Sequence, residues 1–313
     1  MSQKDNDNEY DLVKICTALF IGIIVISILM TVFDPPKNNI DQIDDMPKIH
    51  DKRLKEETNG STPYNIKELD TSTIPGNKLK GEIHSISDSF NYIPHNVTSV
   101  MFMNISNIND EETKSMFGSK DDYYKYYNDQ MQTRTIVNTT NVVEYELHTT
   151  KSRIIPNPFE VTNYEGFWIL RRTDSTNAAN KWHTIGDIRV MTRKIYLMKF
   201  IDGHLNNDMK HPNIQAITQF QTNNPISQYI RYLEDGTLCY GELNKDSNGY
   251  AYRIACENPT DEYIKTINLL KDSSSYEYNI IENSSDYFVY DIKGNSIQNI
   301  MNETQRQVMV GLE

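Results

Sequence analysis

An uncharged stretch of 19 residues near the N-terminus constrains this chain more than any other feature. From residue 15 to residue 33 the sequence reads ICTALFIGIIVISILMTVF. As a helix rising about 1.5 Å per residue, it would span roughly 28 Å, close to the roughly 30 Å hydrocarbon core of a bilayer. Lys14 precedes the stretch, and Asp34-Pro35-Pro36 ends it, because proline cannot continue a helix. We therefore predict a transmembrane anchor over 15–33.

The alternatives to an anchor are a cleaved signal peptide and a buried helix of a soluble protein. The apolar run is longer than that of a usual signal peptide, and no small-residue cleavage motif follows before Asp34. The positive-inside rule does not choose an orientation, since Lys4 and Lys14 precede the run while Lys37 and Lys48 follow it. We expect a single-pass signal-anchor that contacts lipid through 15–33, with the C-terminal part luminal, extracellular or exposed on a virion.

The rest of the chain divides into a stalk and a folded domain. Residues 1–14 form a short tail, and residues 34–80 carry 8 basic and 9 acidic side chains without a sustained apolar period. Such a composition is typical of a flexible linker. Denser patterning begins near Gly81, so we predict a stalk over 34–80 and a globular domain over 81–313.

The domain is expected to be α+β, formed mainly by antiparallel strands with a few helices. Strands are predicted where β-branched and aromatic residues gather, at 97–105, 141–148, 166–171, 187–200, 214–220, 228–233, 276–281 and 287–292. Helices are predicted from Asp110 towards Phe117, after Thr260, and over 296–310, each from an N-terminal signal or a stripe of apolar residues.

A hairpin around Asp246-Ser247-Asn248-Gly249 predicts a disulfide. If Lys245 pairs with Tyr250, then Cys239 lies directly opposite Cys256. Directly opposite residues in a non-hydrogen-bonded pair of antiparallel strands have Cα atoms about 4.5 Å apart, and a disulfide can bridge that distance. Two separate core thiols are the alternative. The bridge would require an oxidising location.

Six glycosylation sequons follow the predicted anchor. They are Asn59, Asn96, Asn104, Asn138, Asn283 and Asn302. The chain has 33 asparagines, and random placement among its serines and threonines gives about five such motifs. The sequons therefore permit a luminal domain, and a glycoprotein, without requiring either.

Charge is unevenly distributed along the domain. The whole chain has a formal charge of −12, which argues against a general nucleic-acid binder. Residues 151–200 nevertheless hold nine basic and four acidic side chains, with Trp168 and Trp182 among them. Such a surface could meet lipid headgroups, an acidic protein face or nucleic acid, or form a solvated strand face. Because arginine and tryptophan are favoured at interfaces, we predict a protein partner, and the candidate contacts are Arg171, Arg172, Arg193 and Lys194.

No catalytic, cofactor-binding or metal-binding motif is present in the sequence. It has no H-E-x-x-H, G-x-S-x-G, P-loop or G-x-G-x-x-G pattern. His204, Asp208 and His211 could share one face of a helix, but Gly203 and Pro212 indicate a loop. We therefore expect no catalytic residues, no cofactor and no metal.

Two resemblances concern the layout of the whole chain. The order of tail, anchor, stalk and domain is similar to that of type II luminal enzymes such as glycosyltransferases. Their acidic D-x-D triplet occurs here only as Asp5-Asn6-Asp7, before the anchor. The abundance of Asn, Ile, Asp, Lys and Tyr, together with the uncleaved span, resembles membrane-anchored virion proteins of large nucleocytoplasmic DNA viruses. That resemblance implies a virion membrane protein contacting a capsid, envelope or cell-surface partner. We expect a non-enzymatic structural or interaction protein, with the luminal enzyme as the alternative.

Overall fold

A computed structural model describes the chain from Glu68 to Val310 in several stretches. These are 68–93, 97–127, 129–139, 144–151, 154–156, 159–172, 181–208, 214, 218–232, 238–247, 249–273 and 276–310. The chain divides into two units, Met1–Asn59 and Gly60–Glu313, and all the described residues belong to the second. The predicted anchor over 15–33 therefore lies outside the described residues. Within the stretches given above, no helix is both long enough and apolar enough to cross a membrane.

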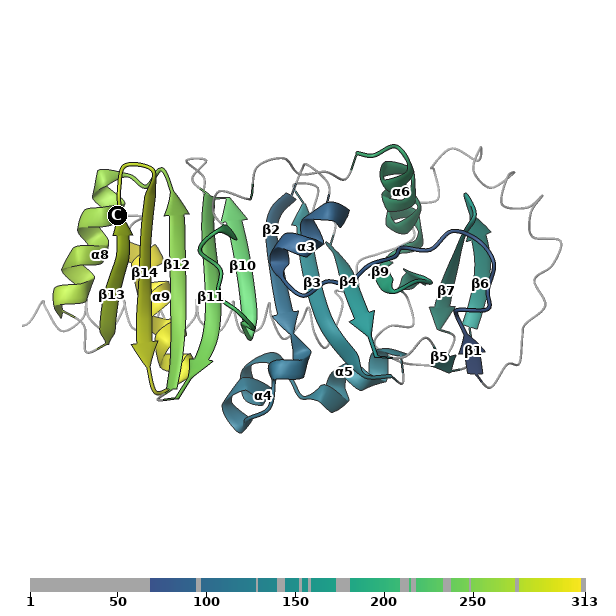
Figure 1. Cartoon of the computed structure of the whole chain (residues 1–313), viewed down its shortest axis with the longest axis horizontal. Coiled ribbons are helices and arrows are strands. Elements are labelled where there is room, and N and C mark those ends of the chain that lie inside the picture. Colours follow the sequence, from purple (N-terminus) through teal and green to yellow (C-terminus); the bar gives the residue numbers. More distant parts are fainter. Residues whose placement is uncertain are drawn as a thin grey trace, which may run out of the picture. The chain divides into compact units, whose positions relative to one another are not determined.

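A twelve-stranded sheet dominates the second unit (Figure 1). Its order is β13-β14-β12-β11-β10-β2-β3-β4-β9-β8-β7-β6, and every neighbouring pair is antiparallel. The strands are β2 (Val97–Asn104), β3 (Met131–Thr139), β4 (Glu144–Thr150), β6 (Phe159–Tyr164), β7 (Phe167–Arg172), β8 (Trp182–Thr184), β9 (Ile188–Thr192), β10 (Ser227–Tyr232), β11 (Leu238–Asp246), β12 (Gly249–Glu257), β13 (Glu277–Asn283) and β14 (Tyr287–Gly294). A separate pair joins β1 (Glu68–Asp70) to β5 (Ile154–Pro156). The predicted α+β class with antiparallel strands is confirmed.

The described helices begin and end largely where capping residues predict. They are α3 (Ile86–Ser89), η2 (Phe90–Tyr92), η3 (Ile105–Asn107), α4 (Glu111–Phe117), α5 (Lys120–Tyr127), α6 (Lys194–Leu205), α8 (Asp261–Ser273) and α9 (Ile297–Val310). The Asp110 carboxylate accepts a hydrogen bond from the Thr113 backbone N–H and so caps α4. The Thr260 hydroxyl accepts one from the Tyr263 N–H at the start of α8. The three helices predicted from the sequence are confirmed.

One face of the sheet, the first face, is covered by chain that precedes the sheet and by α6. Directly paired residues of antiparallel strands point to the same side, so Val100, Ile230 and Tyr240 share this face. They belong to one apolar cluster, together with residues of α3, η2 and α6. Figure 1 shows α3 on the near side of the sheet and α9 behind it. The covering segments therefore come from both before and after the central strands.

The opposite side, the second face, is covered in two parts. At the β13 end, α8 and α9 pack on the apolar residues of β11, β12 and β14, among them Leu243, Ile254 and Phe288. Further along the sheet, α5 lies over β3, β4 and β9, where Tyr123 and Tyr127 are buried. The first of these parts is apolar, whereas the second contains charged side chains described below.

Two predicted strands were wrong. Residues 187–200 contain only the short strand β9, and the chain then continues as α6. Leu197, Phe200 and Ile201 are buried at helical spacing, so their apolar character follows a helix period rather than a strand period. In 214–220, the described residues are 214 and 218–220; none of them lies in a strand, and the Thr218 N–H donates to the Ile214 carbonyl.

The packed part of the chain begins before Gly81. Residues 68–80 were assigned above to the stalk, yet β1 pairs with β5, and Asn77 bridges to Phe167. Leu79 is buried in the core of the first face. Leu79 stands alone between polar residues in the sequence, and it packs from an irregular segment. No helix or strand periodicity therefore indicated that it is buried. The described packing therefore starts at Glu68.

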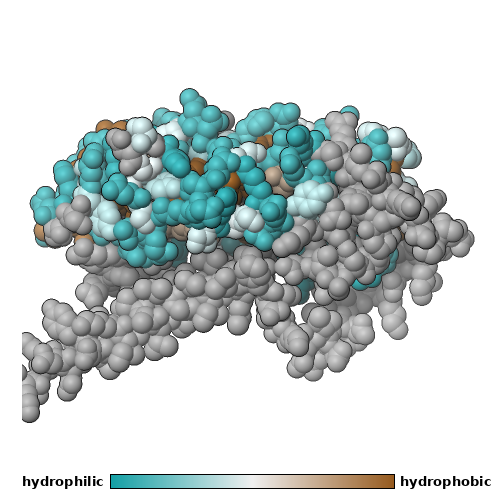
Figure 2. All heavy atoms as spheres, turned by 90° about the horizontal axis from the view of Figure 1, so that it is seen from below, coloured by the Kyte–Doolittle hydropathy of each residue, from teal (hydrophilic) through white to brown (hydrophobic). Residues whose placement is uncertain are grey.

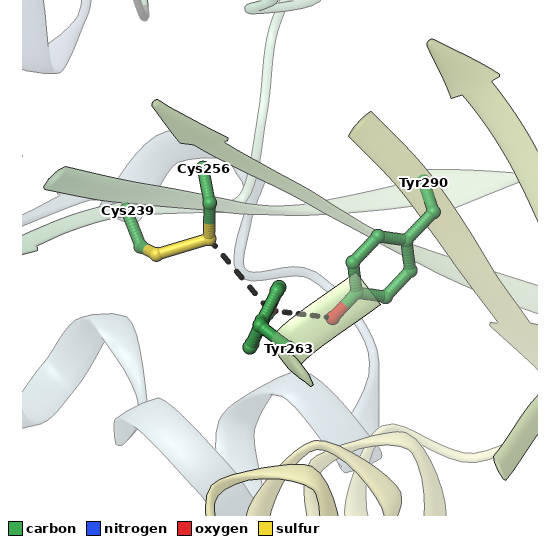
Figure 3. Close-up of a disulfide and its surroundings, with 4 residues drawn as sticks. All are labelled: Cys239, Cys256, Tyr263 and Tyr290. Carbon is green, nitrogen blue, oxygen red and sulfur yellow. Dashed lines mark hydrogen bonds between the residues drawn. A yellow bond between two sulfur atoms is a disulfide. The ribbon is translucent and has the colours of Figure 1, made fainter. Parts of the chain in front are cut away.

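The hairpin of β11 and β12 has the predicted register. Lys245 pairs with Tyr250, and Cys239 pairs with Cys256. The two cysteines form a disulfide with a Cα–Cα distance of 4.2 Å. Figure 3 shows the bridge beside α8, where the Tyr263 hydroxyl donates to Cys256 Sγ at 3.6 Å and lies 3.1 Å from the Tyr290 hydroxyl. The predicted disulfide is confirmed. It links β11 to β12 at the place where the hairpin contacts Tyr263 of α8.

We predict that removing the bridge lowers the free energy of unfolding by about 3 kcal/mol, from the entropy of closing a loop of this length. The double variant Cys239→Ser/Cys256→Ser and the reduced wild-type protein should lose about the same amount in chemical denaturation. Cys16→Ser is the matched control and should change nothing. Equal stability of the oxidised and reduced proteins would contradict the prediction.

Candidate functional site

The structure brings two of the four predicted contact residues together around one tryptophan. Arg171 lies on β7 and Lys194 is the first residue of α6. The Arg171 guanidinium carbon is 5.6 Å from the centre of the Trp182 ring, and Lys194 Nζ is 4.5 Å from it. Arg193 directly precedes α6 and is exposed. The side chain of Arg172 lies outside the described residues.

Arg171 and Lys194 contribute to packing as well as to charge. Trp182 is only 6% exposed, so the two cationic side chains help to cover its ring. Arg171 also pairs with Glu160, whose carboxylate oxygen lies 2.5 Å from the Arg171 terminal nitrogen. Reversing either charge would therefore disturb the first face. The remaining exposed cations of this region are better probes of binding.

The exposed side of α6 combines basic and apolar residues. Ile195 is 38% exposed and Leu205 is 49% exposed, and Lys199 is exposed between them. The described chain exposes five large hydrophobic side chains, and two of the five lie on this helix. On the side seen in Figure 2, the described surface is mainly hydrophilic. We define the α6 surface by its members, Arg193, Lys194, Ile195, Lys199 and Leu205.

The charges at the start of α6 do not favour the helix itself. A helix N-terminus carries a partial positive charge and prefers acidic residues, yet the first turn of α6 has none. Arg193 occupies the N-cap position without a capping hydrogen bond from its side chain. Serine or aspartate would stabilise this position by about 1 kcal/mol relative to a residue that cannot cap. The basic residues there are therefore not explained by helix stability.

A second group of charged residues lies buried on the second face beneath α5. Glu146 on β4 is 0% exposed, and its carboxylate accepts hydrogen bonds from three cationic or polar donors. Arg134 Nε donates at 2.6 Å, Lys181 Nζ at 2.7 Å and His148 Nε2 at 2.9 Å. Burial alone raises the pKa of Glu146, but Arg134, Lys181 and the hydrogen bond from His148 outweigh burial and hold it well below its usual range. Glu146 is therefore an ionised acceptor.

The same group contains a tyrosine, a histidine and a glutamate in line. The Tyr127 hydroxyl is 2.7 Å from His148 Nδ1, and the other ring nitrogen donates to Glu146. The Arg189 guanidinium lies 4.5 Å from the centre of the Tyr127 ring. Such a series could relay a proton, but Tyr127 and His148 are buried, so a substrate would reach the hydroxyl only after α5 had moved. In the structure, these buried residues hold α5 against the sheet through Tyr127.

Sequence reasoning did not identify this buried group. The strand over 141–148 was predicted, but the acidic and histidine positions of NVVEYELH were not assigned a partner. The signal was present as a period of two, since Glu146 and His148 alternate with Tyr145 and Leu147. Arg134 lies directly across from His148. That pairing depends on β3, which was not predicted.

Four of the six predicted sequons fall within the described residues. Asn138, Asn283 and Asn302 are exposed, and Asn104 is half-buried. Asn59 and Asn96 lie outside those residues.

The three candidate metal ligands do not share one helix. His204 is part of α6 and not of a loop, Asp208 follows that helix, and His211 lies outside the described residues. Among the described residues, no group of three His, Cys, Asp or Glu side chains is arranged to hold a metal.

Comparisons with known proteins assign no family. No protein-family model matches the chain, and no curated protein matches it. Among solved structures, crystal form I of the Treponema protein TP0453 aligns with a TM-score of 0.46 and 9% identity, over 70% of this chain and 98% of that chain. Crystal form III of TP0453 aligns with a TM-score of 0.42 and 7% identity, over 69% and 97%. At these scores the similarity carries no argument about function.

We predict that Glu146→Gln lowers the free energy of unfolding by about 3–5 kcal/mol, because Arg134 is left buried without its counter-charge. Glu160→Gln is the matched control, since it removes the exposed partner of Arg171 and should cost no more than about 1 kcal/mol. Chemical denaturation of both variants near pH 7 measures the difference. Equal effects would show that the buried pair adds no more stability than the exposed one.

Proposed function

We propose that this chain is a single-pass membrane-anchored interaction protein that displays its β-rich domain for binding to another protein. The support for the anchor is the uncharged run over 15–33. The support for an oxidising compartment is the disulfide between Cys239 and Cys256. A virion membrane, with a capsid or envelope protein as partner, is the setting that the resemblance in layout and composition favours.

The observation that carries the binding proposal is the composition of the α6 surface. Two exposed cations, Arg193 at the N-cap and Lys199, alternate in sequence with the exposed aliphatic residues Ile195 and Leu205 of α6. An apolar centre with arginine around it is typical of protein interfaces. The matching partner surface would be acidic at its rim and apolar at its centre. Opposite charges would speed the encounter, and the aliphatic contacts would slow dissociation.

Arg193→Asp separates binding from helix stability. The substitution supplies a side chain that can cap α6 and places a negative charge at the N-terminus of the helix, so it should raise the stability of the domain by about 1 kcal/mol. Combined with Lys199→Glu, it should lower recovery of the partner several-fold. The measurement is affinity capture of full-length protein extracted in mild detergent, followed by quantification of the proteins that co-purify, alongside thermal unfolding of each variant.

The matched control for this experiment is Lys265→Glu/Lys271→Glu on α8, which reverses two exposed charges on another helix. It should leave recovery of the partner unchanged. Unchanged recovery for the α6 variant would reject the α6 surface as the binding site. Binding of a sugar nucleotide by the full-length protein would instead favour the luminal enzyme.

The proposed topology makes a separate prediction. In native membranes, Cys239 and Cys256 should resist alkylation until they are reduced, and glycosidase treatment should remove glycans from one or more of Asn138, Asn283 and Asn302. The protein should stay in the membrane pellet after alkaline carbonate washing, and deletion of 15–33 should release it. Free thiols together with unmodified sequons would place the domain in a reducing compartment and contradict the proposal.

A further inference from the structure

The tyrosines of α5 attach it to the second face through apolar packing and through contacts with charged or titratable side chains. The Tyr127 hydroxyl donates to His148 Nδ1 at 2.7 Å. The rings of Tyr123 and Tyr126 lie 5.9 Å and 5.8 Å from the Arg134 guanidinium carbon. Only Tyr123 and Tyr127 of this helix join an apolar cluster as buried residues. Part of the attachment of α5 therefore depends on a contact with His148, whose charge can change.

Among the described side chains near His148, cations outnumber carboxylates. On its own strand lies Glu146, and directly across on either side lie Arg134 of β3 and Arg189 of β9. Among the described side chains, the other charged or titratable groups of this region are Tyr123, Tyr126 and Tyr127 of α5, Lys181 and His183 at β8, and Asp129 after α5. Three permanent cations thus face two carboxylates before His148 takes up a proton. A protonated ring would add a fourth positive charge.

The hydrogen bonds of His148 define one tautomer of the neutral ring. Nε2 carries the proton that is donated to Glu146, so Nδ1 is left as the acceptor of the Tyr127 hydroxyl. An imidazolium carries a proton on both nitrogens and can accept at neither. The Tyr127 hydroxyl would then have to turn and accept from Nδ1, and the added positive charge would lie buried between Arg134 and Arg189. Proton uptake therefore favours any state in which α5 has moved away and water reaches the ring.

We propose that His148 is the sensor of an acid-released latch, in which protonation of its ring frees α5 from the second face of the sheet.

The direction of the pH effect follows from the two states of the latch. Burial lowers the pKa of His148 below its ordinary value of 6.5, whereas the released state exposes the ring and restores that value. The closed latch is therefore fully stable above the ordinary pKa and loses stability as the pH falls below it. With one proton involved, the equilibrium shifts about tenfold per pH unit until the lowered pKa is reached. Glu146 stays ionised throughout, because its pKa is held well below its usual range.

Hydrogen exchange of the full-length protein in detergent micelles tests the latch. After correction for intrinsic rates, the amides of 120–127 should lose protection about tenfold per pH unit between pH 6.5 and the lowered pKa. The amides of α8 should keep theirs, because the disulfide and apolar packing hold that helix. His148→Gln should remove the pH dependence of α5 while the wild-type protein retains it. Exchange in α5 that does not change between pH 7.5 and pH 5 would overturn the proposal.

Three further variants identify the sensor. Tyr127→Phe removes the donor to His148 and should lower α5 protection at neutral pH as well, with a weaker dependence on acid. His183→Gln, on the neighbouring strand, and the exposed His84→Gln should both leave the pH dependence intact. Loss of the effect in His183→Gln would assign the sensor to His183 and reject His148. If His148→Gln fails to fold, titration of the ¹³C-labelled histidine rings in the wild-type protein decides instead, since His148 must titrate together with the exchange of α5.

Discussion

A sheet twelve strands wide has two broad faces, and the need to cover both of them organises the rest of this domain. The first face is covered by irregular chain and short helices that come before the sheet, and by α6 from its middle. The second face is covered by α8 and α9 at one end and by α5 further along. Because the covering segments alternate with strands in the chain order, the sheet cannot complete its core until distant parts of the sequence have come together. The folded unit therefore extends back at least to Glu68.

The sequence predicted what depends on neighbours along the chain and missed what depends on distant partners. The hairpin register, and with it the disulfide, follows from a turn and simple pairing, so Cys239 could be placed opposite Cys256. The strand β3 was missed because MQTRTIVNT is rich in polar residues, and its Arg134 pairs with Glu146, which lies on the next strand. The start of α6 was assigned to a strand because residues 187–200 are rich in β-branched and aromatic residues. The residues of α6 that are buried on the first face follow a helical spacing, and this pattern was not recognised from the sequence. The same reasons apply to the site, since the charges of α6 were visible and their arrangement around Trp182 was not.

Two buried carboxylates show different ways of satisfying a charge inside this sheet. Glu146 accepts from Arg134 and Lys181 and is compensated by full positive charges. Glu242 on the first face is equally buried, and its hydrogen bonds come from neutral donors, namely Thr222, Gln228, Tyr240 and Asn244. A carboxylate held by neutral donors is insensitive to the protonation of a neighbour. Around a carboxylate that is held among cations, the repulsion between positive charges increases when a neighbouring group becomes protonated. Of these two carboxylates, the one under α5 is therefore the one whose surroundings respond to a newly protonated neighbour.

The short strand β8 connects the two surfaces that carry the proposals. Trp182 points to the first face, where Lys194 of α6 and Arg171 lie against its ring. His183, the next residue, points to the second face and packs edge-on against Tyr127 at 5.1 Å between ring centres. Adjacent residues of a strand are rigidly related, so displacement of α5 acts on the same three-residue strand that supports the α6 surface. Close packing transmits such a displacement, because no gap is left to absorb it. We therefore expect acid release of α5 to alter the α6 surface through β8, whereas the disulfide-bonded end of the sheet, which shares none of these contacts among the described residues, should keep its structure.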